Sequence, residues 1–495
     1  MAADLIGGVP ADAAQLVELV ELEYGGLVLP YLTLGDAAQL RRVCRRLRTA
    51  VAAHRWDDRS TIVYDLGSWR RAFPRATVCR LGRCTVTQHD LLSLRQVRWI
   101  IFEAGVEPSP GALRDLPRTM HIFSAARCLD LWQCHSLYFT DRELQQLSHV
   151  RQLMINADSV SDAGVIALSS VVELRMLTSG VSRITDRGLT SLRHIVQLDL
   201  MGAHVLDMGA CTRAGFIWLA PTLRRLRLQS IPNLHLDDSV FSALELESLF
   251  LDECPLVTLS DVGLAALASI QVLHLIYMPG FSCTDWGISQ LAGIEVLQIY
   301  GGGDVDITDD GVAALSGIRI LQLSNLNSVR VTDDGIMAIA GASMIDLSGC
   351  PLVCIQGWGL SALMHCAHLD ISRTGSSVAP EIVEWLAEAG TTIIIDDEHS
   401  DDFIDDDFIG DDFIGDDFIG DDFIGDDFIG DDFIGDDFIG DDNAFDDDNV
   451  DDDFEDFTDG AFALGDAARW LSDIAAATAD VGEGDVGGEA EVDTD

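Results

Sequence analysis

The sequence of 495 residues contains no lysine, because all 31 of its basic residues are arginine. A Walker-type phosphate loop, a kinase active site and Schiff-base chemistry each need a lysine amine, so we expect none of them. The first residues lack a basic stretch followed by an apolar run, and no apolar run is long enough to cross a membrane. These absences predict an intracellular protein, cytoplasmic or nuclear, without a membrane partner.

The 11 cysteines are an odd number and follow no signal peptide. Reduced thiols are therefore expected. Two pairs, Cys350 with Cys354 and Cys79 with Cys84, could be interpreted as metal ligands, but no second pair stands at zinc-site spacing. We expect no metal and no other cofactor.

Charge is distributed unevenly along the chain. The net charge is −51, and residues 396–495 carry 40 acids and one arginine, or −39 of it. The preceding 395 residues are only mildly acidic. Nucleic-acid binding needs a basic surface, so we expect no nucleic-acid partner.

The dominant pattern is an internal repeat of about 24 residues. Its clearest copies are residues 184–189, 307–312 and 331–336, which read Ile/Val-Thr-Asp-x-Gly followed by an apolar residue. Eleven copies begin with an anchor at residues 141, 162, 186, 213, 238, 261, 285, 309, 333, 357 and 380. Each anchor opens a short helix, and an alternating strand such as Leu198-Asp199-Leu200 begins about twelve residues later. The recurring Asp of these copies predicts a helix cap, which accepts backbone N–H groups.

A unit with one strand and one helix cannot bury its own apolar face, but stacked units can. The sequence therefore predicts an α/β solenoid over residues 57–395, with a parallel sheet on the concave side of a horseshoe. Cys134, Cys254 and Cys350 recur where the chain turns after a strand, and Ala203, Ile231 and Met278 take the same place elsewhere. We therefore expect these thiols to be small core groups. The pattern resembles the cysteine-containing subclass of leucine-rich repeats.

Residues 1–56 differ from the repeats and predict a small all-α head. Asp36 and Gln39 form a capping-box pattern before a helix that carries Leu40, Val43, Leu47 and several arginines. The stretch from Leu29 to Arg48, with its Tyr-Leu pair and Val-Cys-Arg-Arg core, resembles the second half of an F-box. A solvated arginine face or contact with nucleic acid are the alternative interpretations of this helix.

The segment 396–495 predicts a disordered acidic tail. Residues 406–440 are seven copies of Asp-Asp-Phe-Ile-Gly, whose five-residue period fits neither helix nor strand. At its start, Ile393-Ile394-Ile395 before three acids resembles a SUMO-interacting motif, but the last repeat needs its strand there. No nucleophile elbow or zinc-protease motif is present, so we expect no enzyme activity.

The strand pattern also predicts which residues face a binding partner. The mid-strand residue of each repeat should face solvent on the concave side. Exposed aromatic residues beside arginine are typical of binding hot spots. The predicted target-binding residues are Trp132, Arg227, Phe250, His274 and Tyr300.

The combined head and repeats resemble the F-box/leucine-rich-repeat substrate receptors of SCF ubiquitin ligases. This resemblance implies a non-catalytic subunit that docks a Skp-type adaptor on a cullin and holds an unknown target protein. The predicted adaptor-binding residues are Leu29, Leu32, Leu40, Val43 and Leu47. The alternative is a protein-binding scaffold without adaptor binding.

Overall fold

The computed structural model describes residue 29 and residues 33–43, 45–110, 120–202, 206–363 and 365–395. The predicted tail lies outside this range. The described chain divides into two compact units, a smaller one with residues up to 61 and 69–76, and a larger one with residues 62–68 and 77–395.

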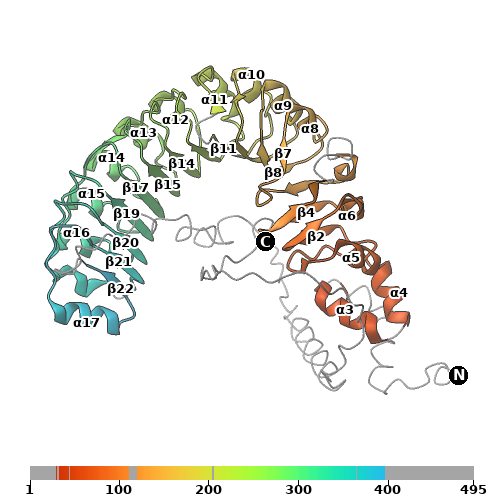
Figure 1. The fold of residues 1–495 in the computed structure, drawn as a ribbon. Helices are drawn as coiled ribbons and strands as arrows, with labels where there is room; N and C mark the ends of the chain where they lie inside the picture. The colour runs from red at the N-terminus through yellow and green to blue at the C-terminus, as the bar shows by residue number, and fades with distance from the viewer. Residues whose placement is uncertain are drawn as a thin grey trace, which may run out of the picture. The chain divides into compact units, whose positions relative to one another are not determined.

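The larger unit is a leucine-rich-repeat solenoid built on one 16-stranded sheet in which every strand pair is parallel (Figure 1). Neighbouring repeats contribute neighbouring strands, as the sequence predicts. Along the sheet the strands are β1 (Ile62–Val63), β2 (Val78–Leu81), β4 (Trp99–Phe102), β6 (Cys128–Asp130), β8 (Gln152–Ala157), β9 (Glu173–Thr178), β11 (Gln197–Met201), β13 (Arg225–Gln229), β14 (Ser248–Asp252), β15 (Val272–Ile276), β17 (Val296–Tyr300), β19 (Ile320–Ser324), β20 (Met344–Asp346), β21 (His368–Asp370) and β22 (Thr392–Ile394), with β7 (Tyr138–Phe139) beside β8.

Short helices form the outer layer of this unit (Figure 1). They are α6 (Gln88–Leu91), α8 (Asp141–Leu144), α9 (Asp162–Ala167), α10 (Asp186–Leu189), α11 (Arg213–Leu219), α12 (Asp238–Phe241), α13 (Asp261–Ala266), α14 (Asp285–Ser289), α15 (Asp309–Ala313), α16 (Asp333–Ala338) and α17 (Pro380–Glu388), with 3-10 turns η3 (Leu92–Leu94), η4 (Met120–Phe123) and η5 (Gly359–Ala362). Helix α5 (Leu66–Ala72) begins in the larger unit and ends in the smaller one. Three two-stranded pairs accompany them: β3 (Cys84–Val86) with β5 (Val106–Pro108), β10 (Ser182–Arg183) with β12 (Leu206–Asp207), and β16 (Ser282–Thr284) with β18 (Asp304–Asp306).

The cysteines of the strand-to-helix turn belong to the core, as expected. Cys134, Cys254 and Cys350 have no exposed surface. Their thiols donate to backbone carbonyls, for example Cys350 Sγ to the Leu323 oxygen at 2.9 Å. Burial raises the pKa of Cys254 and Cys350 to about 11, so both stay protonated at neutral pH. They act as small apolar groups that also satisfy a buried carbonyl.

In several repeats the turn after the strand contains a residue with a left-handed backbone. Ser230, Glu253, Tyr277, Asn325 and Arg373 have φ between 47° and 57°. Each of these residues lies two positions after the second apolar residue with which its strand faces the core. The bend that turns the chain from strand to outer layer is thus fixed by backbone geometry, although only some repeats use the residue types that favour it.

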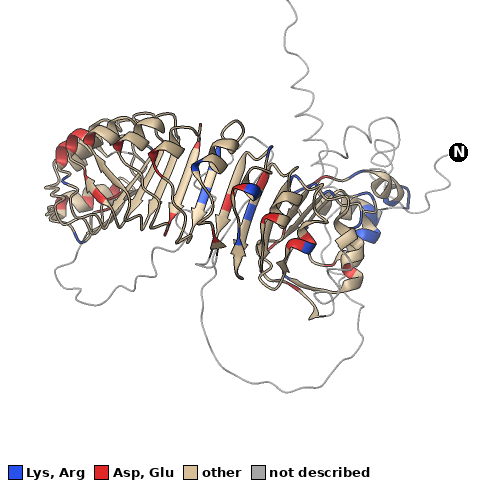
Figure 2. Cartoon of the chain, turned by 90° about the horizontal axis from the view of Figure 1, so that it is seen from above, with Lys and Arg blue, Asp and Glu red and all other residues tan. Residues whose placement is uncertain are grey.

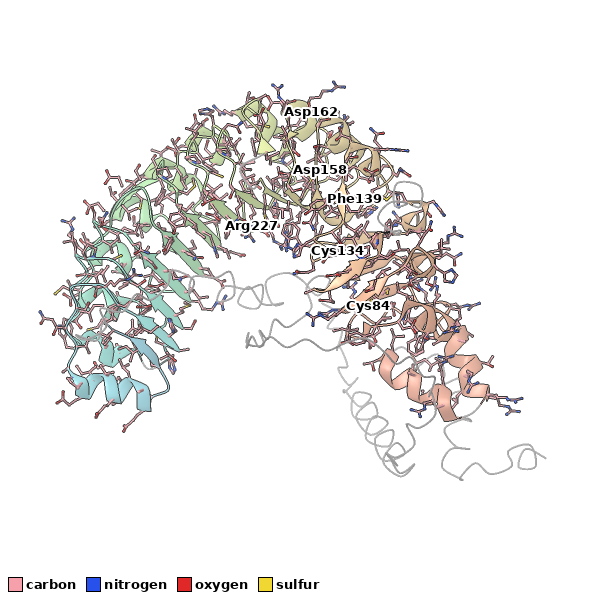
Figure 3. The ribbon with its side chains drawn as sticks, in the orientation of Figure 1. Cys84, Cys134, Phe139, Asp158, Asp162 and Arg227 are labelled. Carbon is pink, nitrogen blue, oxygen red and sulfur yellow. The ribbon has the colours of Figure 1, made fainter. Side chains whose placement is uncertain are left out.

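The prediction that the recurring Asp caps its helix is wrong. The cap is the Ser or Thr one residue earlier, as where Thr185 accepts the Arg187 N–H. The Asp side chain instead binds the next repeat: Asp162 accepts the backbone N–H of Thr185 at 2.8 Å and its hydroxyl at 2.6 Å. Figure 3 shows Asp162 on the outer side of the solenoid. In α12 the residue at the cap position is itself an Asp, at position 237.

The last strand of the sheet is formed by the apolar run that also resembles a SUMO-interacting motif. Residues 392–394 form β22 and pair in parallel with β21. The apolar run therefore serves as the strand of the last repeat, which the sequence favoured over a SUMO-interacting motif.

The smaller unit contains α3 (Leu34–Val43) and α4 (Arg45–Ala53). The expected start at Asp36 is wrong, because α3 begins two residues earlier, where the Asp58 carboxylate accepts the Leu34 N–H at 2.6 Å. Burial raises the pKa of Asp58, but hydrogen bonds from Thr61, Leu34 and Ser60 outweigh it and leave the pKa lowered. Trp56 lies in the core of this unit, where it packs edge-on against Phe73 and donates to the Val51 carbonyl at 2.8 Å.

Candidate protein-binding face

The inner face of the sheet carries three rows of side chains that run across the strands. Strand register places equivalent positions side by side, as in Phe250, His274 and Gln298 of β14, β15 and β17. We call these the first, middle and third rows, in the order in which their residues follow one another along each strand. In β15 the three rows are Val272, His274 and Ile276, and the intervening leucines face the core.

Three of the predicted target-binding residues form one stack in the middle row. The guanidinium of Arg227 lies 4.1 Å from the centre of the Phe250 ring. Phe250 in turn lies 5.3 Å from the His274 ring, with a tilt of 34° between the ring planes. Figure 3 shows Arg227 on the inner side of the solenoid. A cation stacked on an aromatic ring is a preorganised contact for a partner protein.

His274 is almost completely buried within this stack, with 3% of its surface exposed. Burial is the main cause that lowers its pKa to about 4, and the nearby positive charge of Arg227 adds to the effect. The Gln298 side chain opposes the shift, although neither ring nitrogen reaches hydrogen-bond geometry with a described group. The imidazole is therefore neutral at physiological pH.

The remaining two predicted residues lie apart from the stack, in the third row. Trp132 packs under the guanidinium of Arg175, 5.7 Å from the ring centre, and Arg175 is paired with Asp199 at 3.1 Å. Tyr300 meets Tyr277 edge to face at 5.0 Å. The five residues therefore make three contact groups, and only Arg227, Phe250 and His274 share one.

The expectation that mid-strand residues are solvent-exposed is wrong for part of the row. Asp199, His274, Gln298 and Gln322 are each at most 9% exposed. Parallel register packs their side chains flank to flank against those of the neighbouring strands. The alternation of residues in each strand predicts which side chains lie on the inner face, but it does not predict how deeply they are buried.

Sequence reasoning also missed the apolar part of the face. Val272, Val296, Ile320 and Met344 form one buried cluster in the first row, on four successive strands. The sequence does contain a signal for this cluster. Each of the four residues stands immediately before the first core-facing residue of its strand, and earlier repeats carry Glu173, Gln197 or Arg225 at that position.

The predicted adaptor-binding residues lie in the smaller unit. Leu29 is 4% exposed, Leu47 has no exposed surface, and Leu40 is half-buried. Leu32 lies outside the described residues, as does the side chain of Val43. Arg41 stacks on Phe73 at 5.4 Å, so part of the arginine face packs within the unit.

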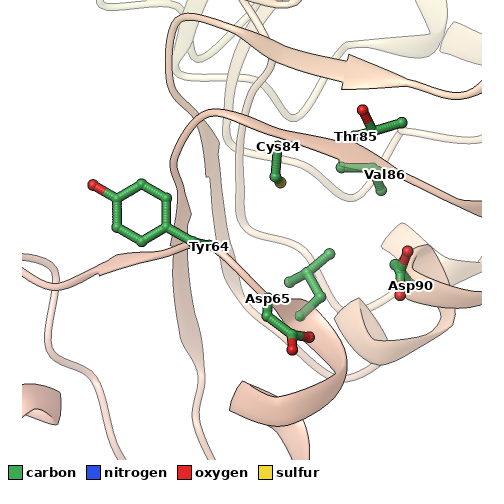
Figure 4. A pocket seen from close by; sticks show the side chains of 7 residues that line it. Tyr64, Asp65, Cys84, Thr85, Val86 and Asp90 are labelled. Carbon is green, nitrogen blue, oxygen red and sulfur yellow. The ribbon is translucent and has the colours of Figure 1, made fainter. Parts of the chain in front are cut away.

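The described residues outside this face include one pocket with a cysteine. A pocket of about 160 Å³ in the larger unit is lined by Tyr64, Leu66, Cys84, Val86 and Asp90, among others (Figure 4). Burial, with Asp90 and Asp65 nearby, raises the pKa of Cys84, so it is a poor nucleophile. Among the described residues no three His, Cys, Asp or Glu side chains are placed to hold a metal ion. No helix in the described part is long and apolar enough to cross a membrane.

No family model and no curated protein matches the sequence. Solved structures similar to the chain are leucine-rich-repeat proteins. A leucine-rich-repeat protein of Leptospira interrogans is 14% identical, with a TM-score of 0.41, and the match covers 74% of this chain and 99% of that one. An internalin of Listeria monocytogenes is 15% identical, with a TM-score of 0.35 and coverage of 61% and 86%. A plant peptide hormone receptor is 10% identical, with a TM-score of 0.35 and coverage of 67% and 73%.

Proposed function

We propose that this chain is a non-catalytic protein-binding subunit that holds a target protein on the inner face of its solenoid. The Arg227–Phe250–His274 stack supports this proposal most directly. It offers a cation and an aromatic ring in one row, backed by the buried imidazole of His274 and held in place by three adjacent strands. A rigid row of this kind binds without paying much ordering entropy.

We further propose that the smaller unit docks a Skp-type adaptor, which would make the chain the substrate receptor of an SCF-type ubiquitin ligase. The support is the F-box resemblance of residues 29–48. Catalysis would belong to other subunits, and this chain would raise the local concentration of the target near the ubiquitin-charged enzyme.

A scaffold without adaptor binding is the second candidate. It is favoured by the burial of Leu29 and Leu47, which removes two of the five predicted contact residues from the surface of the smaller unit. A surface with fewer apolar contacts gives weaker docking.

Capture of a purified Skp-type adaptor by the full chain separates the two candidates. We expect the wild type to retain the adaptor and a Leu40→Asp, Val43→Asp variant to lose it, because an unpaired charge in an apolar contact is costly. Leu352→Asp is the matched control, since Leu352 is 52% exposed within the repeats. A wild type that retains no adaptor or cullin would leave the scaffold as the function.

A further inference from the structure

The last strand of the sheet, β22, is paired along one edge only. It ends the sheet order and pairs in parallel with β21 (Figure 1). No other strand of the described residues lies along its second edge, whereas β20 and β21 before it each lie between two neighbours. An open edge strand presents backbone groups without partners and can accept a strand from another protein.

The backbone of β22 directs alternate residues to this open edge. On the β21 side, the Thr392 N–H donates to the Ala367 carbonyl at 2.9 Å, and the Ile394 carbonyl accepts a hydrogen bond at 3.0 Å. Successive residues of a strand direct their N–H and C=O groups to opposite sides. The backbone groups of Ile393 and Ile395 therefore point to the open edge.

The open edge is accessible, in contrast to the interior of the sheet. Ile394 is 41% exposed, and Ile393 is only half-buried. Strand register aligns Ile393 with Leu369 and Ile345 of the two preceding strands, and neither of these has any exposed surface. The last repeat lacks the neighbour that covers the same position elsewhere. A strand added at this edge would bury the apolar surface that remains.

The charges around the open edge are acidic. Residues 379–398 contain six acids and no basic residue. Glu381, Glu384 and Glu388 are exposed on α17, and the other three acids, residues 396–398, follow the strand directly in the sequence. Figure 2 shows further acids on the helices of the preceding repeats. These charges favour a basic partner and oppose a second copy of this chain, whose net charge is −51.

The strand and the acids after it also resemble a SUMO-interacting motif. The role of β22 in the last repeat is compatible with such a motif, because the repeat uses one edge of the strand and leaves the other open. We propose that β22 binds a SUMO-type modifier by accepting one of its strands at the open edge, with residues 393–395 as the pairing segment. Backbone hydrogen bonds would hold the added strand, and basic side chains beside it would meet the acids that follow Ile395.

A modifier attached to a target would then engage the chain at β22 while the target itself lies on the inner face. Two linked contacts bind more tightly than either contact alone. This consequence rests on the proposed function, whereas the binding at β22 does not. Failure of the experiment below would leave target binding at the stack unaffected.

Titration of isotope-labelled SUMO with the unlabelled full-length chain, followed by NMR, tests the proposal. We expect saturable shifts that are confined to one edge strand of SUMO and the basic residues beside it. The amides of that strand should also exchange more slowly with solvent in the complex, because they become hydrogen-bonded to β22.

Two substitutions at Ile395 separate backbone pairing from side-chain contact. Ile395→Pro removes the N–H that points to the open edge, and Ile395→Ala keeps it, while both lose the isoleucine side chain. Both leave the N–H groups that bond to β21 in place. We expect the proline variant to bind SUMO about tenfold more weakly than the alanine variant, because an acceptor in the contact is left without its donor.

A second pair of variants tests the charges and does not depend on the strand. The first neutralises the acids after β22: Asp396→Asn, Asp397→Asn and Glu398→Gln. It should bind severalfold more weakly, with a flatter salt dependence. The control neutralises three exposed acids of other repeats and should bind like the wild type: Asp304→Asn, Asp310→Asn and Asp334→Asn.

Three results would overturn the proposal: no binding of SUMO to the wild type, equal binding to the proline and alanine variants, or equal losses in the two charge variants. A dimer of the chain that Ile395→Pro dissociates and Ile395→Ala does not would also overturn it, since a second copy would then occupy the edge.

Discussion

Asp261 and Gly287 stand in adjacent repeats, and the carboxylate of the first occupies the space that a Cβ on the second would fill. A Cβ built at Gly287 would lie less than 3.0 Å from Oδ1 of Asp261. The same carboxylate accepts the Thr284 backbone N–H at 2.8 Å and the Thr284 hydroxyl at 2.7 Å. The Thr-Asp-x-Gly sequence of each repeat is therefore one inter-repeat joint, in which the Asp of one repeat meets the Thr and Gly of the next.

A Gly287→Ala substitution should therefore destabilise the solenoid. The new methyl group forces the Asp261 carboxylate out of its hydrogen bonds, and overpacking of this kind costs about 1–3 kcal/mol. Urea unfolding of the full chain measures the effect. Gly293→Ala is the matched control, because nothing lies within 4 Å of a Cβ there. Equal urea midpoints for the two variants would show that a clash with Asp261 is not the reason for glycine at position 287.

The carboxylate itself can be tested at Asp309, which accepts the Thr332 N–H and hydroxyl, both at 2.7 Å, and the Gly335 N–H at 3.1 Å. Asp309→Asn replaces one acceptor oxygen with a donor and should lower the free energy of unfolding by about 1–3 kcal/mol. Asp310→Asn removes the same charge one residue later, where the side chain is exposed, and should change stability by less than about 0.5 kcal/mol. Equal losses for both variants would show that net charge, and not the joint, is responsible.

These joints show why the repeats could be predicted from the sequence while the role of their Asp could not. Period, strand and helix follow from apolar spacing, which each repeat carries locally. A helix cap and an inter-repeat acceptor require the same residue type near the same position, so Asp162 and Asp261 fit both interpretations. The choice depends on a partner about 23 residues later in the chain, which only the stacked structure brings into contact.

The binding face shows a similar division. Alternation placed Arg227, Phe250 and His274 on the inner side, and strand register then brought them into one stack. Trp132 and Tyr300 do not join that stack. Trp132 packs against Arg175, and Tyr300 packs against Tyr277. The burial of His274 and Gln298 depends on what packs beside them, and alternation within a single strand contains no information about that.

The buried imidazole predicts a pH dependence of stability. The pKa of His274 is about 4 in the folded chain and about 6.5 when unfolded. Between these values the unfolded chain binds the proton and the folded chain does not, so stability is lost as the pH falls from 6.5 towards 4. The loss attributable to this group is at most about 3 kcal/mol. Urea unfolding at several pH values should show a shallower dependence for His274→Gln than for the wild type. The exposed His235, changed to Gln, should leave the dependence unaltered.

Loss of the stack should weaken capture of the target. In an Arg227→Ala, Phe250→Ala variant the cation and its aromatic support are both removed, and truncation of such anchors typically costs 2 kcal/mol or more, about thirtyfold in affinity. Affinity capture followed by mass spectrometry compares the proteins held by wild type and variant. Trp286→Ala removes an aromatic residue that is 53% exposed on α14 and serves as the control. A target captured equally by the double variant would place the binding site elsewhere.

The absence of lysine has a consequence if the chain is a ligase receptor. A receptor stays beside the ubiquitin-charged enzyme while the complex is assembled and is therefore exposed to self-modification. Ubiquitin is ordinarily attached through a lysine amine, and none of the 31 basic side chains supplies one. We expect the chain to be modified poorly while its target is modified efficiently. An in-vitro ligase assay with the reconstituted complex measures this, in parallel with a variant in which exposed arginines such as Arg46 and Arg48 are changed to Lys. The variant should acquire ubiquitin chains that the wild type lacks, whereas equal modification of both would show that the missing amine does not protect the receptor.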